Sequence, residues 1–410
     1  MRAVSRVDDY RAIVGDEEVD ELYLLAERLK GKSVQNINST ATGGGVAEIL
    51  SRMVPLLRDL GIDAHWDVIK GNEKFFTVTK EMHNALHGLN VEVSKDDLEY
   101  FLEVNRQNQE EMDLFGDIVF IHDPQPIGLV EKREHNGNKW IWRCHIDISE
   151  PQKATMDFLR GFIDRYDAAV FSAPSFARSD IAAKQILISP SIDPLSEKNR
   201  ELPQGVIDSV TERYCLDRNR PIVTQISRFD YFKDPLGVIE VYKKVKDHID
   251  CQLVLAGGGA TDDPEGPQVL DQIRSAVQSD PDIHIIYLPP SSDLEVNALQ
   301  RASTVVLQKS LREGFGLTVA EALWKAKPVI ATATGGIPLQ IEHRHSGILA
   351  YSTAGMAHYL MELLSEPEYA AKLGMNGREH IRNNFLITRH IKDYLCLFIS
   401  LYHKEDMVYL

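Results

Sequence analysis

The chain has 410 residues, of which 43% are hydrophobic, and a formal net charge of -16. This length exceeds what one ordinary hydrophobic core organises, so we expect a globular protein of two domains. The acidic balance argues against broad binding to nucleic acid or to anionic membranes. It does not exclude an anionic small-molecule substrate, because a few local cations suffice to bind one.

The cysteines and the distribution of apolar residues indicate the cellular compartment. The four cysteines, Cys144, Cys215, Cys251 and Cys396, form no CxxC pair and have no metal-ligand spacing. They are typical of buried thiols in a reducing environment. The N-terminal residues lack the apolar segment of a signal peptide, and no apolar run reaches membrane-spanning length. We therefore expect a cytoplasmic protein without a membrane partner.

The first half of the chain alternates predicted strands and helices. We predict strands at 34–38, 64–69, 117–121, 140–144, 168–171 and 185–188, and helices at 16–30, 46–60, 74–88, 95–112 and 154–165. Strands that alternate with helices form a parallel, doubly wound sheet. Residues 1–190 are therefore predicted to form a Rossmann-like domain.

A second α/β run follows Pro190 and Pro194, which punctuate the chain as a linker does. Its predicted strands are 222–226, 252–256, 284–288, 304–308, 328–331 and 347–350, with helices between them. Residues 195–385 are predicted to form the second Rossmann-like domain, and the C-terminal 45 residues are predicted to be helical. Open sheets of this kind bind ligands at the carboxyl ends of their strands.

The segment from Glu313 to Glu321 sets two glutamates around a glycine-rich turn, Gly314-Phe-Gly316. An apolar strand precedes the turn and a helix follows it. The first turn of a helix offers unpaired N–H groups and partial positive charge to a phosphate. Carboxylates accept hydrogen bonds from sugar hydroxyls. The pattern therefore favours a ligand with phosphate between two sugars, such as a nucleotide sugar.

Arg228 and Lys233 follow the first strand of the second domain. Arginine grips phosphate oxygens with two donors, and lysine acts as a point charge. The alternative is a solvated surface pair, but the position after a strand favours ligand binding.

Two glycine-rich loops are weaker signals. Gly43, Gly44 and Gly45 follow a strand and precede a helix, so they either approach a phosphate or sugar or form a flexible turn. A second such loop, 256–259, leads into an acidic stretch at 262–265 without ordered ligand spacing, so no metal site is predicted.

Polar clusters end two strands of the first domain, at 122–126 and 143–147. Asp123 and His145 are able to hydrogen-bond hydroxyl groups there. A lone histidine is more often structural, but two clusters at neighbouring strand ends favour a site.

These motifs resemble those of retaining GT-B glycosyltransferases of glycosyltransferase family 4. Within that family, the runs IWRCHIDIS (141–149), HDPQP (122–126) and SRFDYFKDPLGVIEVY (227–242) are similar to those of trehalose glycosyltransferring synthases. The resemblance implies two Rossmann-like domains facing a cleft, with the helix at about 386–410 crossing back to pack on the first domain. It also implies an NDP-glucose donor (ADP-, UDP- or GDP-glucose), a free glucose acceptor and trehalose as the product, in a reaction expected to be reversible.

The resemblance also assigns roles to residues of this chain. It implies catalytic roles for His145, Arg228, Lys233 and Glu313. The implied nucleotide-sugar set is Gly43, Gly44, Gly45, Arg228, Lys233, Glu313, Gly314, Phe315, Gly316, Leu317, Thr318 and Glu321. In this set Arg228 and Lys233 hold the diphosphate, Glu313 the glucose hydroxyls and Glu321 the ribose. His145 lies near the donor glucose, on the side of the departing phosphate, and Asp123 and Gln125 are weaker candidates for the acceptor.

The expected ligands are small molecules: NDP-glucose as co-substrate, glucose and trehalose, with no tightly bound cofactor and no nucleic acid. A divalent cation is allowed as a stimulator without a protein metal site, and a homodimer is allowed. Three alternatives stay open. They are a retaining trehalose phosphorylase, a non-catalytic sugar-nucleotide-binding protein and, as the weakest, a nucleotide-sugar epimerase.

Overall fold

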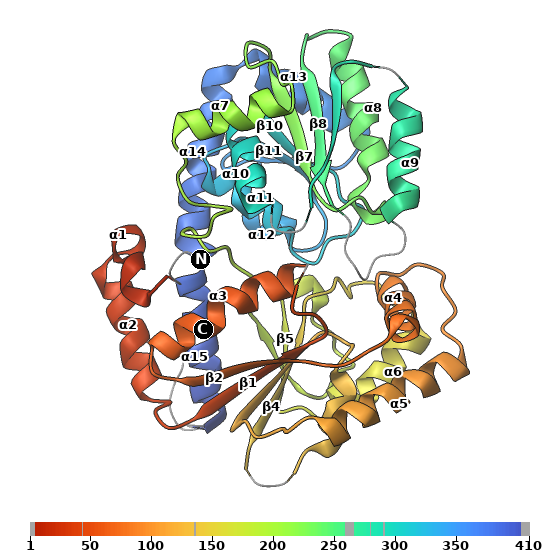
Figure 1. Ribbon diagram of the computed structural model, residues 1–410, viewed down its shortest axis with the longest axis vertical. Helices are drawn as coiled ribbons and strands as arrows, with labels where there is room; N and C mark the ends of the chain where they lie inside the picture. Colours follow the sequence, from red (N-terminus) through yellow and green to blue (C-terminus); the bar gives the residue numbers. More distant parts are fainter. Residues whose placement is uncertain are drawn as a thin grey trace. The chain divides into compact units, whose positions relative to one another are not determined.

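The computed structural model describes residues 5–42, 44–134, 137–258, 266–278, 280–289 and 292–402 (Figure 1). The chain forms two compact units. Unit 1 comprises Met1–Ser191 together with Ile387–Leu410, and unit 2 comprises Ile192–Leu386. Each is an α/β unit built on one six-stranded sheet, which confirms the predicted fold class.

The sheet of unit 1 is parallel throughout, with the order β2-β1-β3-β4-β5-β6. Its strands are β1 (Ser33–Asn38), β2 (Asp63–Val68), β3 (Ile118–His122), β4 (Lys139–Cys144), β5 (Ala168–Phe171) and β6 (Lys184–Leu187). The central strands β3 and β4 are almost wholly buried, which explains their near-continuous apolar sequence. The carboxyl ends of β1, β3 and β4 therefore lie side by side along one edge.

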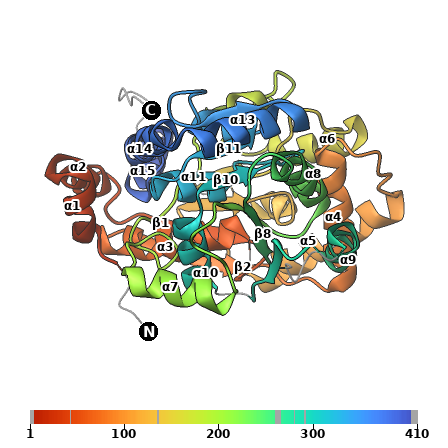
Figure 2. The ribbon, with the colours of Figure 1, turned by 90° about the horizontal axis from the view of Figure 1, so that it is seen from above.

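Helices cover both faces of this sheet. They are α2 (Asp16–Glu27), α3 (Gly45–Asp59), α4 (Glu73–Leu86), α5 (Lys95–Glu111), α6 (Lys153–Ile163) and α15 (Ile387–Tyr402), preceded by the short η1 (Val7–Tyr10) and α1 (Arg11–Val14). Figures 1 and 2 show α2, α3 and α15 on one face and α4, α5 and α6 on the other.

The C-terminal helix α15 returns to unit 1, as predicted. It contacts α2, and its Tyr394 and Phe398 rings lie 5.0 and 5.8 Å from the ring of Phe120 on β3. Aromatic burial of this kind contributes much of the energy that holds a helix on a sheet. The last strand of unit 1 and its last helix are thus separated in sequence by all of unit 2.

The sheet of unit 2 is also parallel, with the order β12-β11-β10-β7-β8-β9. Its strands are β7 (Ile222–Ile226), β8 (Gln252–Gly257), β9 (Ile283–Tyr287), β10 (Val305–Gln308), β11 (Val329–Thr332) and β12 (Ile348–Ala350). The order in which the strands are added reverses between β7 and β10, because β8 and β9 lie on one side of β7, whereas β10, β11 and β12 lie on the other. Ligands bind at such a switch point in doubly wound sheets.

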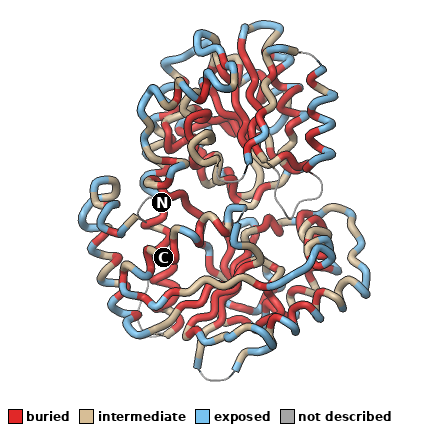
Figure 3. Tube along the Cα trace, in the orientation of Figure 1, coloured by how far each residue is buried: buried red, intermediate tan, exposed pale blue. Residues whose placement is uncertain are grey.

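Successive side chains along the unit 2 strands point alternately into two hydrophobic cores. Val223, Leu253 and Leu255 point into one core, whereas Val254 and Ala256 point into the other, as the two-residue period of a strand requires. Strands β7, β8, β10 and β12 are accordingly buried along their length, whereas the edge strand β9 is only partly buried (Figure 3). The helices are α7 (Gln204–Arg213), α8 (Pro235–Lys246), α9 (Gly266–Val277), α10 (Asp293–Ala302), α11 (Leu317–Trp324), α12 (Ile337–Gln340), α13 (Thr353–Ser365) and α14 (Pro367–Asn384).

Several elements did not stand out from the sequence pattern. They are α1, α7, α12 and α13 and the 3-10 helices η1, η2 (Ile127–Lys132), η3 (Pro174–Phe176) and η4 (Tyr231–Lys233). Within the described residues, no helix is both long and apolar enough to cross a membrane.

Candidate sugar-nucleotide site

The loop after β7 holds Lys233 at the end of a fixed turn. The Asp230 carboxylate accepts a hydrogen bond from the Lys233 amide (3.1 Å), which caps η4. Asp234 then adopts a left-handed conformation (φ 45°) and caps α8 by accepting from the Gly237 amide (3.0 Å). Asp is among the few residues that tolerate this conformation, and Pro235 suits the first helical position. Two consecutive caps therefore fix the backbone of the turn that carries Lys233.

Lys233 and Glu313 form the centre of the unit 2 site. The Nζ of Lys233 lies 2.6 Å from Oε2 of Glu313. The Ser310 hydroxyl donates to the same carboxylate oxygen (3.0 Å), and Glu313 is only 8% exposed. A charged pair with an extra hydrogen bond is a rigid arrangement. The structure thus brings together two of the predicted catalytic residues.

Arg228 lies at the more accessible side of the same loop. Its Nη2 is 3.3 Å from Oδ2 of Asp230, and its side chain is 40% exposed. The loops after β7 and β10 are joined directly, because the Leu311 amide donates to the Phe232 carbonyl (2.7 Å). Arg228, Lys233 and Glu313 therefore belong to one connected pair of loops.

Glycines shape the loop between Glu313 and α11. Gly316 has φ 83° and is the N-cap residue of α11, where no side chain caps the helix. Gly335 has φ 55°, and a Cβ atom there would lie 1.6 Å from the Glu313 carbonyl oxygen. Neither position accepts a larger residue without moving the loop. The amides that begin α11, at Leu317 and Thr318, remain the group expected to face phosphate.

Phe315 and Thr318 make contacts inside unit 2. The Phe315 ring lies 5.5 Å from that of Phe385, and the Thr318 hydroxyl donates to Oε1 of Gln308 (3.1 Å). Through these contacts, Phe315 and Thr318 stabilise the conformation of the loop. Gly314 carries the loop past Gly336, where a Cβ would lie 2.9 Å from the Gly314 carbonyl oxygen.

Glu321 lies in the helix, and its surroundings were not predicted. It is 1% exposed, and Oε1 lies 3.6 Å from Nζ of Lys198. A buried carboxylate requires such a partner. Lys198 lies in the segment that precedes α7 and carries no sequence signal that would have singled it out.

Unit 1 presents a separate cluster at the ends of β3 and β4. Asp123 is left-handed (φ 68°), and its Oδ1 accepts a hydrogen bond from the His145 amide (2.8 Å). Nδ1 of His122 lies 3.1 Å from Nε2 of His145, and Nε2 of His122 lies 3.1 Å from Oδ1 of Asn36. The structure brings the predicted Asp123 and His145 together. Asn36 and His122 were not singled out, although His122 precedes Asp123 in the predicted cluster.

Burial and one buried cation set the protonation of this cluster. The Arg143 guanidinium is 0% exposed and donates to the Ser172 hydroxyl (3.2 Å). Burial, assisted by Arg143, lowers the pKa of His122 to about 3 and holds the pKa of His145 well below its usual value. Burial raises the pKa of Asp123 to about 7, against the opposing effects of the His145 amide and Arg143. The histidines are therefore neutral near pH 7.

The remaining predicted residues of unit 1 follow β1 or β3 or lie outside the described part. Gly44 is the N-cap of α3 with φ 82°, and Gly45 begins that helix. Gly43 lies outside the described residues. The backbone carbonyl of Gln125 accepts from the Asn105 amide group (3.1 Å).

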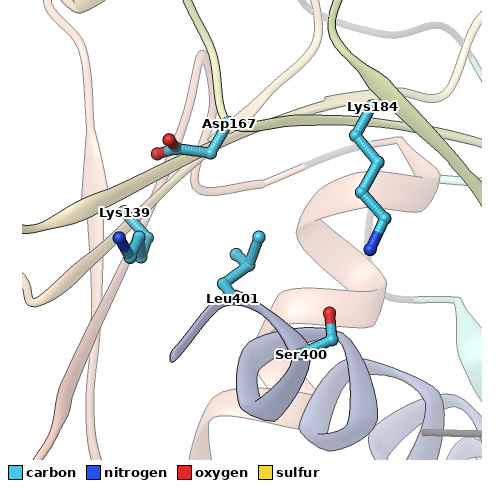
Figure 4. A pocket seen from close by; sticks show the side chains of 5 residues that line it. All are labelled: Lys139, Asp167, Lys184, Ser400 and Leu401. Atoms are coloured by element: carbon cyan, nitrogen blue, oxygen red, sulfur yellow. The ribbon is translucent and has the colours of Figure 1, made fainter. Parts of the chain in front are cut away.

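Among the described residues, no group of three or more His, Cys, Asp or Glu side chains is arranged to hold a metal ion. The acidic stretch at 262–265 is not among those residues. A separate pocket of about 330 Å³ opens in unit 1 beside Lys139, Asp167, Lys184, Ser400 and Leu401 (Figure 4). It lies at the amino ends of β4, β5 and β6 and so is not part of the cluster around His145.

Two Rossmann-like units with a cation–carboxylate pair at a switch point define a glycosyltransferase of the GT-B class. The family described as "Glycosyl transferases group 1" matches residues 210–380, and "Trehalose synthase, N-terminal domain" matches residues 36–178. The chain is 45% identical to the trehalose synthase of Pyrococcus horikoshii, over 97% of this chain and 96% of that protein. It is also 45% identical to the trehalose synthase of Rubrobacter xylanophilus, over 96% of both. The chain belongs to the trehalose synthase family.

More distant comparisons agree with the fold. A trehalose phosphorylase of Pleurotus pulmonarius is 31% identical over 93% of this chain, which spans 59% of that protein. The solved trehalose-phosphate synthase of Burkholderia xenovorans superposes with a TM-score of 0.74 at 12% identity, over 90% of this chain and all of that one. The sucrose-phosphate synthase of Thermosynechococcus elongatus gives 0.71 at 16% identity, over 91% of this chain and all of that one.

Proposed function

We propose that this protein transfers glucose from an NDP-glucose to free glucose, with retention of configuration, and so forms trehalose. The single observation that carries the proposal is the Lys233–Glu313 pair at the switch point of unit 2. It places a cation for phosphate and an acceptor for hydroxyls within one hydrogen-bond length, as a sugar phosphate requires. Trehalose is proposed as the product because the relatives of similar length are named trehalose synthases. Unit 2, about 195–385, is proposed as the nucleotide-sugar domain, and residues 1–190 with about 386–410 as the acceptor-side domain.

The proposed chemistry depends mainly on stabilising the leaving diphosphate. Arg228, Lys233 and the amides that begin α11 supply positive charge, which a preorganised site delivers without reorganisation cost. Glu313 accepts hydrogen bonds from glucose hydroxyls. Glu321, buried beside Lys198, is proposed to bind the ribose.

The proposed transfer needs no nucleophile from the protein. The bond between the anomeric carbon and the diphosphate oxygen breaks, and its electron pair stays on the diphosphate. The acceptor hydroxyl bonds to the same carbon from the same face, and its proton passes to the departing diphosphate. The reaction is proposed to be reversible, and its reverse step would use the same groups. His145, as a neutral ring, and Asp123 are proposed as hydrogen-bonding groups for sugar in unit 1.

Trehalose phosphorolysis is the second candidate, because the Pleurotus relative carries that name. The two reactions differ in whether a nucleotide takes part. The ribose-binding role proposed for Glu321 requires a nucleotide ligand, so the contribution of Glu321 to nucleotide affinity separates them. A cytoplasmic location and a homodimer remain predictions.

One assay tests the proposal. Purified protein is incubated with glucose and, separately, ADP-, UDP- and GDP-glucose, and the product is identified by NMR from its two equivalent anomeric protons. A parallel reaction supplies trehalose and inorganic phosphate. Trehalose formation from a nucleotide sugar supports the proposal. Glucose 1-phosphate from the second reaction alone would establish the phosphorylase instead, and no product from either would overturn both.

A further inference from the structure

Three side chains form a hydrogen-bonded chain across neighbouring strand ends of unit 1. Asn36 lies on β1, His122 ends β3 and His145 follows β4, and these strands are adjacent in the sheet. The Asn36 and His122 side chains are buried, whereas His145 is only partly buried. The two ring contacts are each 3.1 Å. The chain therefore leads from the interior of the unit to a residue that solvent reaches.

The direction of each hydrogen bond follows from the buried end. The amide nitrogen of Asn36 donates to the His65 carbonyl (3.2 Å), so its oxygen is the atom that faces His122. An amide oxygen only accepts, and the facing Nε2 of His122 must therefore carry a proton.

A neutral imidazole has one ring proton, so the other nitrogen of His122 accepts. Nε2 of His145 must then donate to Nδ1 of His122. It follows that His145 holds its only ring proton on Nε2, and its Nδ1 carries a lone pair.

This reasoning requires both rings to be neutral, and the surroundings enforce that. Arg143 on β4 acts on both rings, and His390 on α15 also acts on His145. Arg389 on α15 acts on His390, and Asp123 accepts from the His145 amide. Burial and Arg143 lower the pKa values of both His122 and His145. Near pH 7 neither ring gains a second proton.

We propose that Asn36 and His122 are positioning residues that fix the tautomer of His145, so that its Nδ1 accepts a hydrogen bond from a sugar hydroxyl. This inference rests on the proposed function. It differs from the expectation that His145 acts beside the departing phosphate, because an acceptor nitrogen repels a phosphate oxygen and attracts a hydroxyl proton. The specificity of the site would then depend on two residues that never touch the sugar.

The first test is spectroscopic and needs no activity. Protein labelled with nitrogen-15 in its histidine rings is studied by long-range proton–nitrogen correlation, with the His145 signals assigned from their loss in His145→Gln. We expect Nε2 of His145 to be protonated and Nδ1 to be unprotonated near pH 7. Protonation at Nδ1, or at both nitrogens, would overturn the proposal even if trehalose forms.

The second test uses matched substitutions of His122. His122→Phe keeps the ring beside Phe120 and His145, which lie 4.6 and 5.5 Å away between ring centroids, but removes the acceptor. His122→Asn removes the ring but keeps an acceptor oxygen near the Nδ1 position. We expect His122→Phe to lower kcat about 10-fold, the effect of one lost hydrogen bond, and His122→Asn to restore part of that loss. Equal rates for wild type and His122→Phe would exclude the positioning role.

Fluorinated sugars separate an acceptor role from a structural one. A deoxyfluoroglucose lacks one hydroxyl donor, so at one ring position the wild type should lose about 10-fold in kcat/KM. In His145→Ala, replacing the same hydroxyl of the sugar by fluorine should not lower kcat/KM any further. Additive losses at every position would overturn the proposal. Absence of trehalose synthesis from any nucleotide sugar would instead defeat the proposed function, while the tautomer measurement would still stand.

Discussion

The ammonium group of Lys233 and the carboxylate of Glu313 meet at 2.6 Å although they belong to different βα loops of unit 2. Lys233 follows β7 and Glu313 follows β10, and these strands are neighbours only because the sheet order reverses there. The pair fixes the spacing between the proposed phosphate-binding and hydroxyl-binding groups. We therefore expect a ligand with phosphate next to sugar to contact both groups without rearranging the loops.

Replacing Lys233 tests the proposed phosphate site. Lys233→Ala removes a cation that faces the developing diphosphate charge, so we expect kcat/KM to fall about 100- to 1000-fold. Lys244→Ala, an exposed position on α8, is the control and should leave activity unchanged. Steady-state kinetics of both variants decide the matter, and near-normal kcat/KM in Lys233→Ala would place the diphosphate elsewhere.

Glu321 requires a test that separates its ion pair from ribose binding. Glu321→Gln removes the buried carboxylate 3.6 Å from Lys198, whose other acidic neighbour, Asp293, lies 3.9 Å away. Both thermal stability and nucleotide affinity should therefore fall, the affinity by at least about 10-fold. Adding Lys198→Met should restore stability but not affinity. Calorimetric titration with UDP and ADP measures the affinity. Recovery of affinity in the double variant would make Glu321 a purely structural residue.

Gly335 is expected to be essential for the shape of the Glu313 loop. In Gly335→Ala the new Cβ would overlap the Glu313 carbonyl oxygen, and φ is 55°. We expect a loss of about 3 kcal/mol in the free energy of unfolding, from overpacking and backbone strain together. The control is Gly161→Ala in α6, where the added Cβ meets nothing within 4 Å, and a gain of about 0.5–1 kcal/mol is expected. Chemical denaturation compares the two, and equal stabilities would refute the steric argument.

Asp123 should make stability depend on pH. Its pKa is raised from 3.8 to about 7 by burial, so folding favours the protonated form. The resulting contribution to stability is complete below the unfolded pKa and is lost as the pH rises through 7. Asp123→Asn keeps a residue that tolerates the left-handed backbone but cannot titrate. The difference in melting temperature, wild type minus variant, should therefore decline between pH 5 and about 7 and be flat above. A difference that is constant with pH would show that Asp123 is ionised throughout.

The sequence predicted the fold because the patterns that specify it are local. Alternating apolar runs and helices between them indicated two parallel sheets, and the structure has six strands in each. The loops after strands then indicated Arg228, Lys233 and Glu313, since ligand sites in such sheets lie at the carboxyl ends of strands. Asp123 and His145 were found by the same reasoning, and the structure joins them by one hydrogen bond.

The partners of these residues required the tertiary structure. Lys198 and Glu321 are far apart in sequence, as are Asn36, His122 and His145, and nothing in their local patterns links them. Their contacts arise from strand order and from helices packed on the sheet. By itself the sequence thus determined the type of fold and the loops that carry the proposed chemistry, because period and turn residues act over short distances. Which buried side chains share a proton or a charge was decided only by folding, because burial and long-range packing create those pairs.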